Sequence, residues 1–106
     1  MATAAQKVEK LMDENNVVVF SKSYCPYCRA TKQTLDELNA IYLAIELDKE
    51  ADGTALQDAV EKLTGQRTVP NVLIQRNHIG GNSDIQSLNK DGKLADLLKQ
   101  CGAIKA

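Results

Sequence analysis

Two cysteines separated by two residues are the feature of the chain with the clearest chemistry. They stand in the run Cys25-Pro26-Tyr27-Cys28. Two thiols at this spacing can cycle between a dithiol and a disulfide, or they can supply half of a zinc site. A closed structural zinc site needs four ligands. The only other cysteine and the only histidine, Cys101 and His78, each stand alone in their segments, so the pattern favours redox chemistry.

The local sequence predicts that Cys25 lies at the start of a helix. Val17 to Phe20 form a continuous apolar run, which is typical of a strand buried on both faces. Pro26 suits the first helical turn, where its missing N–H would have no intrahelical partner. Cys25 would then be the N-cap, with the free N–H groups of Tyr27 and Cys28 and the helix dipole favouring its thiolate. Because the thiolate is the nucleophile, we predict that Cys25 attacks and that Cys28, one turn into the helix, resolves.

Three further side chains each have a functional and a structural interpretation. Lys22 precedes Cys25 by three residues, so its charge would favour the thiolate; the alternative is an ordinary surface lysine. Cys101 lies on an apolar helical stripe, where a cysteine usually acts as a small buried hydrophobic residue. His78 lies in a predicted hairpin, and a role as a general base would require that hairpin to reach the cysteines. We expect a functional role only for Lys22.

The remaining apolar pattern alternates between helix and strand spacing. Residues 4–15, 26–39, 54–64, 83–88 and 94–101 have helical spacing, whereas 17–20, 41–47, 72–75 and 78–79 have strand character. Thr54 with Gln57, and Ser83 with Gln86, have the spacing of a capping box. The early alternation predicts a parallel strand pair joined by a crossover helix, and the pair near residue 75 predicts a hairpin. We therefore expect an α/β fold with a mixed four-stranded sheet and helices on both faces.

Two later segments resemble parts of a binding site. Thr68-Val69-Pro70 precedes a predicted strand, and Pro70 can be cis in a tight turn or trans at the start of that strand. A cis bond would leave the main chain of Val69 free to pair with an extended peptide. Gly81-Asn82-Ser83-Asp84 leads into a helix, whose free N–H groups can bind an anion. A plain helix cap explains the same run.

Composition excludes several other classes of protein. With 106 residues the chain is one ordinary domain, and a net charge of −1 creates no field that favours nucleic acid or anionic membranes. One phenylalanine and three tyrosines offer little surface for stacking bases. The longest apolar run, Val17 to Phe20, is far shorter than a bilayer span. The N-terminus has no basic segment followed by an apolar core, so the sequence predicts no secretory signal.

The motifs above, in order and spacing over essentially the whole chain, resemble those of the dithiol glutaredoxins. The resemblance is carried by Cys25-Pro26-Tyr27-Cys28, by Thr68-Val69-Pro70, and by His78-Ile79-Gly80-Gly81 followed by Ser83-Asp84. It implies a thioredoxin fold in a single domain, residues 1–106, with Pro70 cis. It also implies a glutathione-dependent oxidoreductase that reduces protein disulfides and protein–glutathione mixed disulfides. A thioredoxin would typically carry Trp-Cys-Gly-Pro-Cys, and the chain has no tryptophan.

The resemblance further implies how glutathione, the co-substrate, is held. Its glycine carboxylate would be bound by Lys22 and Gln66, with Arg67, and its cysteinyl unit would pair with the Val69 backbone. Its γ-glutamyl carboxylate would be held by Ser83 and its ammonium by Asp84. The groove would be lined by Tyr27, Thr68 and Pro70. Two departures leave the cysteine pair untouched: Asn82 stands where the family often has cysteine, and Gln75-Arg76-Asn77 replaces Asn-Gly-Lys in the hairpin. Without glycine there, we expect Asn77 to take the left-handed conformation.

The family also contains members that bridge a [2Fe–2S] cluster between two subunits with glutathione as a ligand. That behaviour goes mostly with glycine or serine in the place of Pro26, so we favour the enzyme and expect no metal. The expected partners are glutathionylated and disulfide-containing proteins, with no nucleic acid and no membrane. We expect a monomer in the cytoplasm.

Overall fold

The fold has the predicted order of helices and strands. A computed structural model describes residues 2–105. Its elements are α1 (Ala4–Glu14), β1 (Val17–Ser21), α2 (Pro26–Glu37), β2 (Leu43–Glu46), α3 (Gly53–Thr64), β3 (Asn71–Ile74), β4 (Asn77–Gly80), α4 (Asn82–Lys90) and α5 (Lys93–Gln100). No helix within the described range is both long and apolar enough to cross a membrane.

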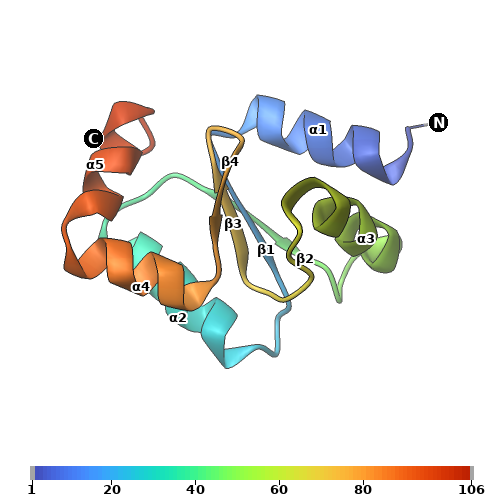
Figure 1. The fold of residues 1–106 in the computed structure, drawn as a ribbon, viewed down its shortest axis with the longest axis horizontal. Helices are drawn as coiled ribbons and strands as arrows, with labels where there is room; N and C mark the ends of the chain where they lie inside the picture. The colour runs from blue at the N-terminus through green and yellow to red at the C-terminus, as the bar shows by residue number, and fades with distance from the viewer. Residues whose placement is uncertain (1, 106) are drawn as a thin grey trace.

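The four strands form one mixed sheet in the order β2-β1-β3-β4. β1 pairs in parallel with β2 and antiparallel with β3, and β3 pairs antiparallel with β4. β1 and β3 are therefore the central strands (Figure 1). Both the parallel pair with its crossover helix and the hairpin were predicted from the sequence.

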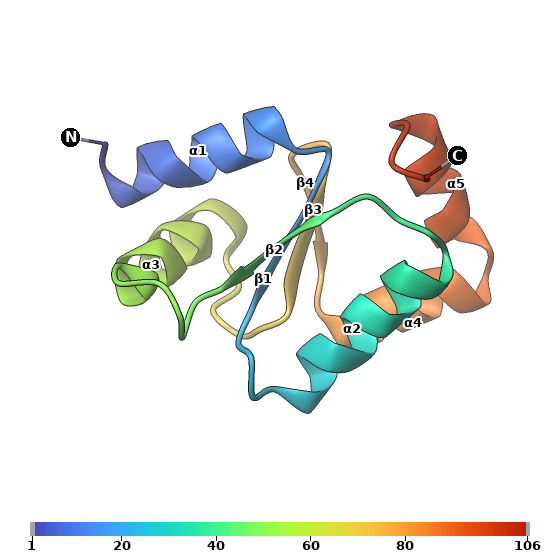
Figure 2. The same cartoon turned by 180° about the vertical axis from the view of Figure 1, so that it is seen from behind.

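Helices cover both faces of the sheet, and the side chains of β1 alternate between two apolar clusters. Val17 and Val19 belong to the cluster under α2, α4 and α5, whereas Val18 and Phe20 belong to the cluster under α1 and α3. Figures 1 and 2 show α1 and α3 on one side of the strands and α2 and α4 on the other. Because all of these β1 residues are buried, the strand has no solvent face, as its continuous apolar run predicted.

The prediction of a strand over residues 41–47 was too long. β2 spans only Leu43–Glu46, and all four of its residues are half-buried rather than alternating. Ile41, outside the strand, is 50% exposed, whereas Leu47 leaves the ladder and is buried in the cluster under α1 and α3. β2 is an edge strand, so its side chains are only partly covered whichever way they point.

The two predicted capping boxes are wrong, because both helices begin earlier. α3 begins at Gly53, which lies so close to the carbonyl of Leu47 that a Cβ atom there would clash with backbone. α4 begins at Asn82, and the carboxylate of Asp84 accepts a hydrogen bond from the Gly81 N–H at 3.0 Å. The N-caps are Asp52, which makes no side-chain cap hydrogen bond, and Gly81, so neither helix begins with the Ser/Thr-x-x-Gln pattern on which the prediction depended.

The hairpin between β3 and β4 also differs from expectation. Gln75 and Arg76 have positive φ angles of 48° and 67°, and Asn77 already belongs to β4. A two-residue hairpin turn of this kind needs positive φ at both central positions. The left-handed residues are therefore Gln75 and Arg76, and the turn ends one residue before Asn77, where the left-handed conformation was expected. Arg76 also pairs with Glu9 and Asp13 of α1, which ties the turn to that helix.

Candidate active site

Cys25 occupies the position predicted for it, at the N-cap of α2. Its backbone is extended, with φ −85° and ψ 120°, and Pro26 is the first residue of the helix. The Cys25 N–H donates to the carbonyl of Lys22 at 3.0 Å, which closes the turn after β1. The end of β1, the start of α2, the segment before β3 and the start of α4 lie at the same edge of the molecule (Figure 1).

The surroundings of the Cys25 sulfur favour its thiolate. Burial raises the pKa of Cys25, but the N–H of Cys28, the thiol of Cys28, the N–H of Tyr27 and the charge of Arg29 together hold that pKa below its ordinary value. The Cys25 sulfur accepts no N-cap hydrogen bond of full geometry. Its pKa is therefore lowered by the dipoles of nearby N–H groups that point toward it. The main cation is Arg29 rather than Lys22, because Arg29 follows Cys25 by one helical turn.

Cys28 has the opposite environment. It is fully buried on the inner face of α2, and burial raises its pKa despite the Ser21 hydroxyl and the N–H of Lys22, which lower it. The Ser21 hydroxyl donates to the Glu46 carboxylate at 2.7 Å, and Lys32 pairs with the second oxygen of that carboxylate at 2.8 Å. Neither cysteine is paired in a disulfide, and the contrast in pKa favours the thiolate at Cys25 over Cys28.

A groove of about 370 Å³ lies beside the thiols. It is lined by Tyr27, Thr68, Val69, Pro70, Gly81, Asn82 and Ser83. The Cys25 sulfur lies 3.9 Å from the Val69 carbonyl, so the thiol faces this wall of the groove. The Val69–Pro70 peptide bond is cis, as the resemblance implied. Five of the residues expected to bind the co-substrate thus line one groove.

Two side chains expected at the glycine end of the groove are engaged elsewhere. The amide nitrogen of Gln66 donates to the carbonyls of Thr68 and Pro70 at 2.9 and 3.0 Å. Its amide oxygen lies 3.1 Å from the ring nitrogen of His78. Arg67 pairs with carboxylates of α3. Gln66 therefore braces the loop before β3, and Arg67 anchors that loop to a neighbouring helix.

The other end of the groove is formed by the start of α4. Ser83 is exposed at this start, and its N–H is among those that lack an intrahelical partner in a first turn. Asp84 caps the Gly81 N–H through one oxygen, and Gly80, with φ 125°, leaves room for that side chain where a Cβ would clash. Together they place free N–H donors and one carboxylate at a single helix start.

Comparison with known proteins decides the family. The glutaredoxin family model matches residues 17–79. Glutaredoxin-C2 of Arabidopsis thaliana is 52% identical over 101 residues, which cover 95% of this chain and 91% of that protein. The glutaredoxin of Vernicia fordii is 51% identical, with 94% of this chain and 96% of that protein covered. The chain belongs to the glutaredoxin family.

Solved glutaredoxins confirm the fold and the class of reaction. The structure of a buckwheat glutaredoxin–glutathione complex has a TM-score of 0.92 and 51% identity, covering 96% of this chain and 93% of that one. Wheat glutaredoxin has a TM-score of 0.90 and 52% identity, with 94% and 93% covered. The thioredoxin fold is therefore shown, and the protein is a glutathione-dependent thiol–disulfide oxidoreductase.

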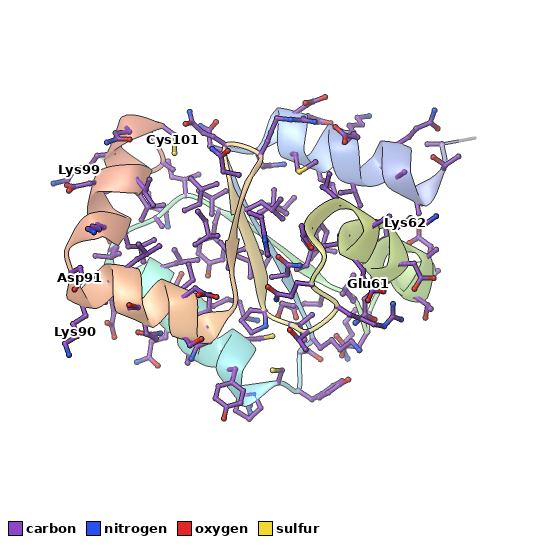
Figure 3. The ribbon with its side chains drawn as sticks, in the orientation of Figure 1. Glu61, Lys62, Lys90, Asp91, Lys99 and Cys101 are labelled. Atoms are coloured by element: carbon purple, nitrogen blue, oxygen red, sulfur yellow. The ribbon has the colours of Figure 1, made fainter. Side chains whose placement is uncertain are left out.

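The third cysteine of this glutaredoxin, Cys101, does not line the groove. Cys101 follows α5 and packs half-buried against the cluster under α2, α4 and α5; Figure 3 shows it at the opposite end of the molecule from the start of α2. Its thiol lies 3.5 Å from the Leu98 carbonyl. Among residues 2–105, no group of three or more His, Cys, Asp or Glu could hold a metal ion.

Two residues of the site were missed by sequence reasoning. Arg29 lies one turn after Cys25, a spacing that itself puts the charge near a helix start. Asn82 stands where the family often has cysteine, and it lines the groove and binds α2. The signal for Asn82 is Thr31, which follows Cys28 by three residues and is buried on the same face of α2, because a buried hydroxyl needs a partner.

The lowered pKa of Cys25 predicts the pH dependence of its reactivity. Only the thiolate reacts, so the rate of alkylation should fall as the pH falls through a midpoint below about 8.5, the value of a free thiol. Arg29→Ala should raise the midpoint more than Lys22→Ala, and both only modestly, because exposed charges are screened. Iodoacetamide labelling followed from pH 3 to 10 measures it, with Cys101→Ser removing background. A midpoint at the free-thiol value would refute the electrostatic argument.

Proposed function

We propose that this glutaredoxin binds glutathione in the groove beside Cys25 and removes it from glutathionylated proteins. The observation that carries the proposal is the position of the Cys25 thiol. Its pKa is lowered, and its sulfur lies 3.9 Å from the Val69 carbonyl on the groove wall. An extended cysteinyl unit pairing with the Val69 main chain would bring its own sulfur next to Cys25. The buckwheat glutaredoxin–glutathione complex supports the choice of ligand.

The reaction proceeds by thiol–disulfide exchange through a mixed disulfide on Cys25, which is resolved by either of two routes. The Cys25 thiolate attacks the glutathione sulfur of a mixed disulfide, and the protein thiolate leaves and takes up a proton. The intermediate is Cys25 joined to glutathione. A second glutathione thiolate then attacks the glutathione sulfur of that bond and releases Cys25 with glutathione disulfide. Alternatively, Cys28 loses its proton and attacks the Cys25 sulfur, which forms the Cys25–Cys28 disulfide and releases glutathione; two further glutathiones reduce that disulfide.

Charge complementarity orients glutathione along the groove. Its γ-glutamyl end carries an ammonium and a carboxylate, whereas its glycine end carries only a carboxylate. The start of α4 offers free N–H groups and the Asp84 carboxylate together, which matches the end that has both charges. We place Ser83 at the γ-glutamyl carboxylate, Asp84 at the ammonium, and Lys22 at the glycine carboxylate.

Removing the charge of Asp84 should weaken glutathione recognition. Asp84→Asn keeps an oxygen that can cap the Gly81 N–H but loses the charge, so the KM for a glutathionylated peptide should rise roughly tenfold, the lower end for a hydrogen bond to a charged group. Asp84→Ala should raise KM at least as much and also destabilise α4. The Cys25 alkylation rate should hardly change, because Asp84 belongs to another helix start. Unaltered KM values in both variants would show that Asp84 serves only as a helix cap and does not bind glutathione.

We also propose that the enzyme acts as a monomer in the cytoplasm, on both glutathionylated and disulfide-containing proteins. The groove is lined by residues of one chain, so the site needs no second subunit. The mechanism requires free thiols, and glutathione keeps thiols reduced in the cytosol. Sedimentation of the reduced protein and fractionation of cells that express the tagged chain would test these two proposals separately.

A further inference from the structure

A group of polar side chains joins α2 to α4 across an otherwise apolar contact. Thr31 and Thr34, which are 0% and 7% exposed on α2, face Asn82 and Gln86 on α4. The Thr31 hydroxyl donates to Asn82 Oδ1 at 2.9 Å, and Gln86 Nε2 donates to Asn82 Oδ1 at 3.1 Å and to the Thr34 hydroxyl at 2.9 Å. Two donors therefore converge on the single amide oxygen of Asn82.

In the structure the Asn82 amide oxygen faces the contact between the helices. Reversing the Asn82 amide alone would set Nδ2 against Gln86 Nε2, and two donors would face each other. Because a carboxamide is planar, holding Oδ1 in the contact between the helices also holds Nδ2. No acceptor within residues 2–105 pairs with Nδ2. Since Asn82 lines the groove between Gly81 and Ser83, Nδ2 is the end of the amide left for a ligand.

We propose that Asn82 is a specificity-determining residue, which donates from Nδ2 to the γ-glutamyl carboxylate of glutathione. Thr31 and Gln86 are the positioning residues that hold its amide. This inference rests on the proposed function, because it places the γ-glutamyl end at the start of α4. A side-chain donor that is already held loses little freedom on binding, and it adds to the N–H groups and the Asp84 carboxylate at the same helix start.

Asn82→Asp removes the Nδ2 donor but keeps an oxygen in the contact between the helices. A carboxylate oxygen still accepts from Thr31 and Gln86, and an acidic residue in the first turn suits the helix dipole, so the protein should remain folded with an unchanged melting temperature. The donor becomes a second acceptor that faces a carboxylate. The KM for a glutathionylated peptide should rise at least roughly tenfold, since a hydrogen bond to a charged group is lost, while kcat changes little.

Three controls make the result specific. Asn89→Asp adds the same charge farther along α4 and should leave KM unchanged. Asn82→Ala removes the donor without adding charge and should also raise KM. The mixed disulfide of the same peptide with cysteinylglycine, which lacks the γ-glutamyl unit, should react with the wild type and with Asn82→Asp at similar KM.

The outcomes separate this inference from the proposed function. A selective rise in KM for the glutathione substrate in Asn82→Asp and Asn82→Ala supports the inference. If the wild type prefers glutathione to cysteinylglycine but Asn82→Asp keeps its KM, the role of Asn82 is refuted while the groove stands. If the wild type treats the two substrates alike, the γ-glutamyl end is not recognised and the proposed groove is wrong.

Discussion

The Cys25→Ser variant is expected to be inactive. In its presence, disulfides should be reduced no faster than by glutathione alone. Serine keeps the N-cap position of α2 but has no thiolate to offer. No other thiol can replace it, because Cys28 is fully buried with a raised pKa and Cys101 lies outside the groove. Turnover of a glutathionylated peptide and of a protein disulfide, coupled to consumption of glutathione, measures the effect.

Cys101→Ser is the matched control for this experiment. It also removes one thiol, but from the end of α5, and it should retain wild-type turnover. Appreciable activity in Cys25→Ser, or a comparable loss in Cys101→Ser, would show that another cysteine is the nucleophile.

Cys28→Ser should keep the route that uses only glutathione and lose the dithiol route. Reduction of glutathionylated peptides should persist at a rate of the same order as wild type, because free glutathione can replace the resolving thiol. The Cys25–Cys28 disulfide should be lost completely, and with it reduction of protein disulfides by the dithiol route. Steady-state rates on both substrates, together with a thiol-labelling gel shift after oxidation, measure the two outcomes.

The buried position of Cys28 explains why this division is expected. Its sulfur lies on the inner face of α2 against Ser21, so it reaches the Cys25 sulfur but not a protein substrate. Equal loss of both activities in Cys28→Ser would contradict the resolving role and would imply that Cys28 is needed for the Cys25 thiolate itself.

The features that could be predicted from the sequence are those set by local pattern. The buried run of β1 and the proline after Cys25 specify a strand, a loop and an N-cap, and the structure has all three. Helix starts at Gly53 and Asn82 could not be predicted in the same way. They depend on close packing against Leu47 and on a capping carboxylate three residues after a glycine.

The site was less predictable where side chains choose among several partners. Gln66 could as readily bind a ligand as brace its own loop, and only the folded positions of Thr68 and Pro70 decide between these. Arg67 is likewise drawn to acidic residues of α3, one turn apart on that helix. The contact between Thr31 and Asn82 joins residues 51 apart in sequence, and no local pattern reports such a distance.

The mixed-disulfide intermediate of the reaction can be trapped, and its position identifies the attacking thiolate. Cys28→Ser would be incubated with glutathione disulfide, denatured in acid to stop exchange, and digested without reduction for peptide mass spectrometry. We expect one glutathione per chain, joined to Cys25, with Cys101 unmodified. Glutathione on Cys101 with Cys25 left free, or no adduct at all, would contradict the assignment of Cys25 as the thiolate that forms the mixed disulfide.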